Sequence, residues 1–267
     1  MLILGIIGYG ATSILLAAYR ADVADRTLNT VISHQNSLNT AFGDINTQLS
    51  ALNTSSAFDS EQALTLVDQS ISSSQLAMKT INDDDRSLRA ASNEVHAVPW
   101  LTVLGRVSLD RDAARIGHAE NALAAARTIA ADQALDGRFW RALYLGLSDF
   151  TALSSQSSSG DTSGAHTTLV KMKTEIDQAA ALSGAPGLPS DLRALMADLQ
   201  TFVGDYGKKL DAQAAGDDAG LSAADTSVEA DVTKIGTYDI DRIGGEIDAF
   251  FRPLIDRYNS EIIAATR

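Results

Sequence analysis

Residues 2–53 read LILGIIGYGATSILLAAYRADVADRTLNTVISHQNSLNTAFGDINTQLSALN, and this stretch decides the fold. Its first part, residues 2–19, carries no charged side chain. At about 1.5 Å per residue, these roughly 18 residues rise about 27 Å, close to the thickness of the hydrocarbon core of a bilayer. The sequence therefore predicts a transmembrane helix over residues 2–19. We expect a retained signal-anchor, since no basic side chain precedes the apolar run and residues 16–18 make a poor cleavage site.

From Ala17 onward the apolar residues are spaced rather than continuous. Their steps alternate between four and three residues, which is the seam of a coiled coil and predicts a helix that packs against another helix. The seam consists of Ala17, Ala21, Ala24, Leu28, Val31, Gln35, Leu38, Phe42, Ile45, Leu49 and Leu52. The polar Gln35 either fixes the register through a polar partner or is simply tolerated there.

A polar turn at residues 53–56 ends this helix, and a second helix begins near Asp59 or Ser60. Its apolar seam has the same spacing and a similar length, so we expect the two helices to form an antiparallel pair. The second seam consists of Leu64, Val67, Ile71, Ser74, Met78, Ile81, Asp85, Leu88, Ser92 and Val95.

The matched seams also predict a register, with Leu28 near Leu88 and Leu52 near Leu64. The second helix contains three consecutive aspartates, residues 83–85. They do not form a calcium loop, because Leu88 stands where such a loop needs its turn glycine. We interpret them as a solvated face of the helix.

Residues 95–107, VHAVPWLTVLGRV, are apolar but too short to span a membrane. Because the first two helices rise by similar lengths, we expect this loop to return to the level of Arg20, beside the bilayer. Apolar side chains around a tryptophan are typical of an interfacial contact, although the loop could instead close the end of the bundle. The predicted membrane or partner contacts are Pro99, Trp100, Leu101, Val103 and Leu104, with Phe250 and Phe251 of the last helix near them.

A third helix is expected from near Ser108 to residue 153, followed by a polar loop at residues 154–164 and three shorter helices. The last of these runs from near Leu221 to the end, bent at residues 244–245 and at Pro253. This gives a transmembrane anchor at 1–19, three long helices at 20–155, and three further helices at 156–267 packed on the same domain. Residues 139–153 are the predicted core; Trp140 and Tyr144 within them either pack there or line a ligand pocket.

The composition agrees with an elongated, all-α antiparallel helical bundle: the 267 residues include only 4 Pro, and 45% of them are hydrophobic. A formal net charge of -13 argues against a nucleic-acid surface, which needs clustered Lys and Arg. The absence of Cys excludes disulfides, thiolate metal sites and cysteine nucleophiles. The four His are far apart in the sequence, and we find no motif for catalysis, a metal or a cofactor.

We therefore expect a single-pass membrane protein that acts by binding, as an interaction or sensor domain within a membrane assembly. Its partners would be the lipid bilayer through residues 2–19 and a protein or a second copy. The basic residues Arg20 and Arg26 after the apolar run weakly oppose an external domain, whereas the acidic, lysine-poor composition favours an extracytoplasmic one. The alternatives are a membrane-remodelling or pore-associated protein and an enzyme of unknown type.

Overall fold

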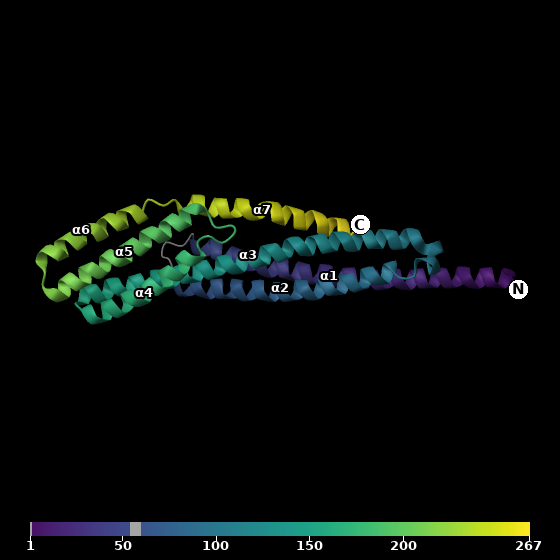
Figure 1. Ribbon diagram of the computed structural model, residues 1–267, viewed down its shortest axis with the longest axis horizontal. Helices are drawn as coiled ribbons and strands as arrows, with labels where there is room; N and C mark the ends of the chain where they lie inside the picture. The colour runs from purple at the N-terminus through teal and green to yellow at the C-terminus, as the bar shows by residue number, and fades with distance from the viewer. Residues whose placement is uncertain (1, 54–59) are drawn as a thin grey trace. The chain divides into compact units, whose positions relative to one another are not determined.

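The computed structural model of the chain describes residues 2–53 and 60–267 and shows an all-α protein (Figure 1). In these ranges there are seven α-helices, two short 3-10 helices and no strands. The α-helices are α1 (Leu2–Asn53), α2 (Ser60–His96), α3 (Arg106–Ser159), α4 (Thr162–Leu182), α5 (Ser190–Ala215), α6 (Asp218–Ile235) and α7 (Ile240–Ala265). The 3-10 helices η1 (Pro99–Leu101) and η2 (Val103–Gly105) lie between α2 and α3. The predicted all-α helical bundle is confirmed.

The chain forms two compact units, each built from segments that are distant in the sequence. The first unit consists of Met1–Gly43, Ser73–Ala131 and Arg252–Arg267, and the second of Asp44–Ser72 and Asp132–Phe251. Helices α1, α2, α3 and α7 each contribute residues to both units. The division into segments 1–19, 20–155 and 156–267 stays a prediction.

In the first unit α1 and α2 pair in an antiparallel arrangement. Arg20 of α1 donates a hydrogen bond to the carbonyl of Ala97, just after α2, and Gln35 Nε2 donates to Asp84 Oδ2 at 3.0 Å. Moving forward along α1 therefore means moving backward along α2 by nearly the same number of residues. The predicted antiparallel pair is confirmed.

The predicted register is confirmed where the structure describes both side chains. Leu28 and Leu88 are fully buried in one apolar cluster of the first unit. The predicted neighbours Leu52 and Leu64 cannot be compared in this way, because the side chain of Leu52 lies outside the described residues.

The buried face of α2 in the first unit differs in part from the predicted seam. Ser74, Ile81, Leu88 and Val95 are buried as expected. The residues buried between them are Ala77, Asp84 and Ala91, instead of the predicted Met78, Asp85 and Ser92. The cause is α3, whose Leu109, Ile116 and Leu123 belong to the same apolar cluster, so α2 packs against two helices and not one.

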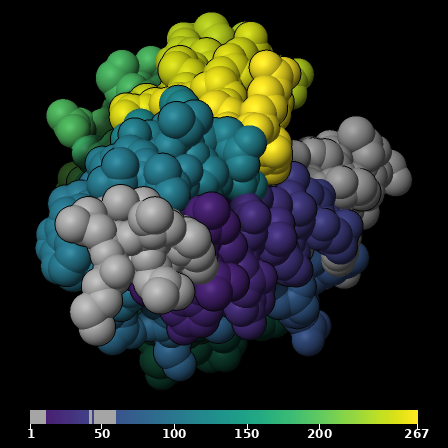
Figure 2. Space-filling model, turned by 90° about the vertical axis from the view of Figure 1, so that its right-hand side faces the viewer, coloured from purple at the N-terminus to yellow at the C-terminus, as the bar shows by residue number. Residues whose placement is uncertain are grey.

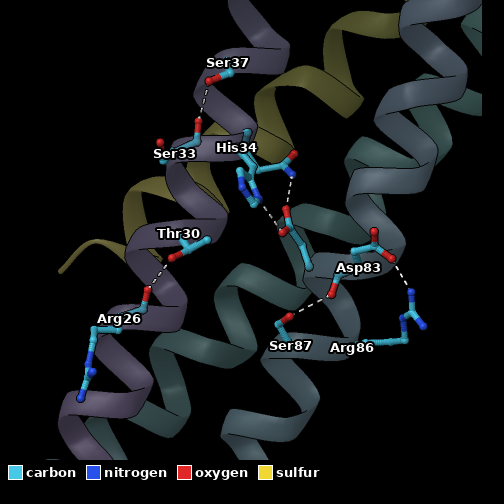
Figure 3. A network of polar contacts seen from close by, with 10 residues as sticks. Arg26, Thr30, Ser33, His34, Ser37, Asp83, Arg86 and Ser87 are labelled. Atoms are coloured by element: carbon cyan, nitrogen blue, oxygen red, sulfur yellow. Dashed lines mark hydrogen bonds and ion pairs between the residues drawn. The ribbon is translucent and has the colours of Figure 1, made fainter.

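The interpretation of residues 83–85 as a solvated face is wrong for Asp84. Its side chain is only 5% exposed, and its other carboxylate oxygen lies 2.8 Å from Nδ1 of His34. In Figure 3, His34 points from α1 toward α2, whereas Asp83 on the neighbouring face binds Arg86 in the solvent. Gln35 thus has a buried polar partner. Of the two interpretations given for Gln35, the structure fits the one in which a polar partner fixes the register.

The last part of α7 packs into the first unit by polar contacts with α3. Arg115 Nε donates a hydrogen bond to the carbonyl of Ala265 at 3.0 Å, where a cation is favoured by the helix C-terminus. His118 Nδ1 lies 2.7 Å from Glu261 Oε2. His118 of α3 therefore faces a carboxylate of α7.

The second unit corrects the predicted helix ends. The serine-rich residues 154–159 belong to α3, with Ser158 Oγ bonded to the carbonyl of Ser154 at 2.8 Å. The chain breaks only at Gly160, which has a φ of 77°, and Asp161 then caps α4 by accepting a hydrogen bond from the N–H of Gly164. A left-handed glycine and a capping aspartate, rather than composition, set this boundary.

The predicted last helix is likewise two helices, α6 and α7, interrupted between Ile235 and Ile240. Gly137 does not interrupt α3; a Cβ at this position would lie 2.7 Å from Cγ1 of Ile71, so the glycine permits close packing of α2. Phe139, Leu143 and Leu153 are buried in the core of the second unit with Phe202 of α5, as the sequence predicted for residues 139–153.

Within the part of the chain that the structure describes, no helix is both long and apolar enough to cross a bilayer. The transmembrane helix predicted over residues 2–19 is therefore not supported. A physical reason is visible from Ser13 onward: Ser13, Ala17 and Arg20 are buried. This side of α1 packs against protein and does not form part of an apolar cylinder.

The Asp84 contact generates a stability prediction. Asp84→Ala leaves the buried amide of Gln35 without its acceptor, so we expect the free energy of unfolding to fall by about 1–3 kcal/mol, measured by urea denaturation. The control Asp83→Ala removes an exposed ion pair with Arg86 and should change stability by no more than about 0.5 kcal/mol. Equal losses in the two variants would mean that Asp84 does not hold the register.

Candidate functional site

The loop between α2 and α3 lies across α1, at the end of the first unit. Leu104 N–H donates a hydrogen bond to Ser13 Oγ at 3.3 Å, and Arg20 binds the carbonyl of Ala97. A Cβ on Gly105 would overlap the Cβ of Ala17, so the loop and the helix touch there. The expectation that this loop returns to the level of Arg20 is confirmed.

The loop is rigid because its backbone polar groups bind within the structure. The N–H groups of Leu101 and Thr102 donate to the carbonyls of Val98 and Pro99, and that of Gly105 donates to Thr102 at 3.0 Å. Thr102 is completely buried, and its hydroxyl also donates to the carbonyl of Pro99 at 3.3 Å. Five N–H groups of the loop, counting Ala97 and Leu104, therefore have acceptors inside the protein.

Large apolar side chains are exposed on this loop and on the adjoining turns of α1 and α3, and we call this set of residues the apolar end. Their exposed fractions range from 42% at Val98 to 87% at Val107. The apolar end consists of Ile14, Leu15, Tyr19, Val98, Trp100, Val103, Leu104 and Val107. Figure 2 looks onto this end of the molecule, where the purple atoms of α1 adjoin the blue-green atoms of the loop and of α3.

The sequence identified only part of the apolar end. Of its predicted contact residues, Trp100, Val103 and Leu104 are exposed members, Pro99 is exposed beside them, and Leu101 is half-buried. Val98 flanks Trp100 in the loop predicted as an interfacial contact, and the members that the sequence missed are Ile14, Leu15, Tyr19 and Val107. The first three had been assigned to the predicted transmembrane helix, and no signal in the sequence shows which side of that segment is covered.

The apolar end has a boundary at the same level on three helices. On α1 the exposed Tyr19 is followed by Asp22, and on α3 the exposed Val107 is followed by Asp110. At the end of α2, Val98 is preceded by the exposed Glu94. The contacts of Arg20 with Ala97 and of Ala17 with Gly105 bring these three transitions to one level.

Phe250 and Phe251 are placed in the second unit. Their rings meet edge to face with centroids 5.2 Å apart. Both rings contact Gly187, whose φ of 90° and closeness to the two rings leave no room for a side chain. Phe251 is only 8% exposed, so it contributes to packing. The proximity of these two residues to Trp100 stays a prediction.

Other regions offer less for a ligand. Trp140 and Tyr144 stack with ring centroids 5.8 Å apart, and both pack against apolar clusters of the second unit. A cavity of about 210 Å³ is lined by Asp177, Lys173, Gln200, Ile176 and Val203. Its carboxylate already accepts hydrogen bonds from Lys173 and Gln200, at 2.5 and 2.8 Å. Among the residues that the structure describes, no three His, Asp or Glu side chains are grouped to hold a metal.

Asp136 of α3 is the most perturbed carboxyl group of the second unit. It is 7% exposed, and its Oδ1 atom has no hydrogen-bond partner. Burial, and then the charge of Asp132 one turn earlier, raise the pKa of Asp136 to about 7. A buried carboxyl group with no hydrogen-bond partner on Oδ1 affects stability more directly than it suggests catalysis.

No protein-family model, curated protein or solved structure matches the chain. The apolar end is therefore taken as the candidate functional site on its geometry alone.

The contact of Gly105 with Ala17 generates a second prediction. Gly105→Ala introduces a methyl group that overlaps Ala17, so we expect the loop to shift and the free energy of unfolding to fall by about 1–3 kcal/mol. The matched control is Gly117→Ala in the middle of α3, where a Cβ meets nothing within 4 Å. This control should gain up to about 1 kcal/mol from helix propensity. Equal effects of the two changes, measured by thermal unfolding, would contradict the described packing.

The pKa of Asp136 generates a third prediction. The unfolded chain loses this proton near the ordinary aspartate pKa of 3.8 and the folded chain only at about 7, so the stability contributed by the proton is lost as pH rises from about 4 to 7. Asp136→Asn keeps the neutral form at every pH. We expect it to raise the free energy of unfolding at pH 8 by on the order of 1–3 kcal/mol and to change it little at pH 4. Denaturation at both pH values provides the measurement, and an equal effect at both would refute the assigned pKa.

Proposed function

We propose that the protein acts by binding at a lipid membrane surface, with the apolar end as its contact. The observation that carries the proposal is the inverted polarity of α1 between residues 13 and 20. Here the polar Ser13 and Arg20 face the loop and are buried, whereas Ile14, Leu15 and Tyr19 are exposed. A helix in water has the opposite arrangement, and polar side chains that face the protein interior are typical of segments in lipid.

The side chains of the apolar end match the layers of a membrane interface. Aliphatic side chains make up most of it, and it contains one tyrosine and one tryptophan, which favour the headgroup region. Acidic side chains begin on α1, α2 and α3 at one level, as a flat surface requires. The sequence of α1 before Thr12 is uncharged and continues in the same direction.

The rigid loop also favours lipid as the partner. Unpaired N–H groups are costly in a bilayer, and five N–H groups of this loop already have acceptors in the protein. A loop that is ordered before binding loses little conformational entropy when it binds. Clustered apolar side chains of this number are also uncommon on the surface of a monomeric protein unless they contact a partner.

On this proposal residues 2–19 contact lipid through the side of α1 that the loop leaves uncovered, and the helical bundle stands at the membrane surface as an interaction or sensor domain. The acidic, lysine-poor composition favours the extracytoplasmic side. Binding, and not catalysis, would be the primary activity of the protein.

Cosedimentation with lipid vesicles tests the proposal. Leu104→Ser on the apolar end should weaken binding by about 1–2 kcal/mol, or about five- to thirtyfold, because it removes a side chain that enters the interface. Leu76→Ser is the matched control: Leu76 lies on α2 of the same unit and is 59% exposed, compared with 61% for Leu104. In the α1–α2 register, Leu76 lies about 30 Å from the boundary of the apolar end, so its replacement should leave binding unchanged.

Tryptophan fluorescence provides an independent readout. Trp140→Phe leaves Trp100 as the only tryptophan, and its emission should shift to shorter wavelength when vesicles are added. Absence of both the shift and cosedimentation would overturn the proposal. A concentration-dependent dimer that Leu104→Ser disrupts, in the absence of any vesicle binding, would assign the apolar end to a second copy instead.

A further inference from the structure

We infer that the lipid surface recognised by the apolar end is zwitterionic or uncharged, an inference that rests on the proposed function. Proteins that bind anionic membranes through electrostatics present several unpaired Lys or Arg at the headgroup level. The charged side chains next to the apolar end are arranged differently. We call them the boundary charges: Asp22, Arg26, Glu94, Arg106, Asp110 and Arg111.

The boundary charges sum to zero, and each of their arginines has a carboxylate neighbour. They comprise three acidic and three basic residues on α1, α2 and α3. Arg26 forms an ion pair with Asp22, Arg106 Nε lies 2.8 Å from Asp110 Oδ1, and Arg111 Nε lies 3.9 Å from Asp112. An arginine with a carboxylate neighbour has less to gain from a lipid phosphate, since it must give up or share that neighbour.

The cation that binds the loop is also unavailable. Arg20 is 6% exposed and its guanidinium binds the carbonyl of Ala97. The loop itself, residues 97–105, contains no charged side chain. A phosphate group that approaches the apolar end would therefore meet no free guanidinium on the loop.

The charge of the whole chain acts in the same direction. The formal net charge is -13, so an anionic bilayer repels the protein at distances up to the Debye length, about 10 Å at 0.1 M salt. Anionic lipid should thus weaken binding that is driven by apolar contact. Salt should reduce the difference between neutral and anionic membranes, because it screens the repulsion.

Vesicle binding by the full chain separates the possibilities. We expect vesicles of phosphatidylcholine to bind at least as tightly as vesicles that also contain phosphatidylserine. Raising the salt concentration should leave binding to phosphatidylcholine unchanged within about twofold and should not weaken binding to the anionic vesicles, since the interaction lacks an attractive charge component.

A double variant, Asp22→Asn with Asp110→Asn, gives a sharper test. It leaves Arg26 and Arg106 without their carboxylate partners at the boundary, so binding to anionic vesicles should increase by up to about fivefold per residue and become sensitive to salt. Binding to phosphatidylcholine should not change. The matched control, Asp83→Asn with Asp68→Asn, changes the net charge equally at exposed positions outside the boundary and should show a smaller gain.

The outcomes distinguish this inference from the proposed function. If the unmodified protein binds anionic vesicles more tightly and salt abolishes the preference, the inference is wrong although the membrane contact stands. If neither kind of vesicle binds, the proposed function fails, and the inference fails with it. Equal gains from the boundary variant and the control would also overturn the inference, because they would assign the effect to net charge alone.

Discussion

The buried contact of Asp84 with Gln35 and His34 is the constraint on which the architecture of the first unit depends. If α1 slipped by seven residues along α2, Leu28 or Phe42 would take the place of Gln35 opposite Asp84. A buried carboxyl group without a hydrogen-bond donor costs several times more than a typical contact provides. The apolar seams alone would tolerate such a slip, because they repeat every seven residues. The polar contact therefore selects one register from several that bury similar apolar area.

That register determines where the loop after α2 arrives. Arg20 meets Ala97 and Ala17 meets Gly105 only in this alignment, and these contacts bring Tyr19, Val98 and Val107 to one level. The boundary of the apolar end is thus a consequence of the contact between Gln35 and Asp84. From the rise of a helix, this contact lies about 20 Å away along α1. A flat boundary on three helices needs this alignment, because a slip of seven residues would displace one helix by about 10 Å.

The sequence predicted the parts of the fold that periodicity determines. The helix pairing, the contact region of Leu28 and Leu88 and the return of the loop all follow from seams of equal length. It did not predict that Asp84, and not Asp85, is buried, since a second neighbour of α2 decides this and the sequence does not show where α3 packs. The serine-rich composition of residues 154–159 predicted a loop, but these residues belong to α3. The signal that ends α3 and begins α4 is Gly160 followed by the capping Asp161.

The unsupported transmembrane prediction and the apolar end have the same physical origin. A hydropathy average adds the contributions of all side chains in a segment and ignores which side of the helix each one is on. By this measure residues 13–20 are apolar except at Ser13 and Arg20. In the structure these two polar residues face the loop, which provides a hydrogen-bond donor for Ser13 and an acceptor for Arg20. The covered side cannot contact lipid, and the uncovered side, with Ile14, Leu15 and Tyr19, has no partner within the described part of the chain that buries it. The same residues that argue against a spanning helix thereby favour a surface contact, since Ser13 and Arg20 are buried against the loop and the uncovered side of the helix offers apolar area to transfer from water.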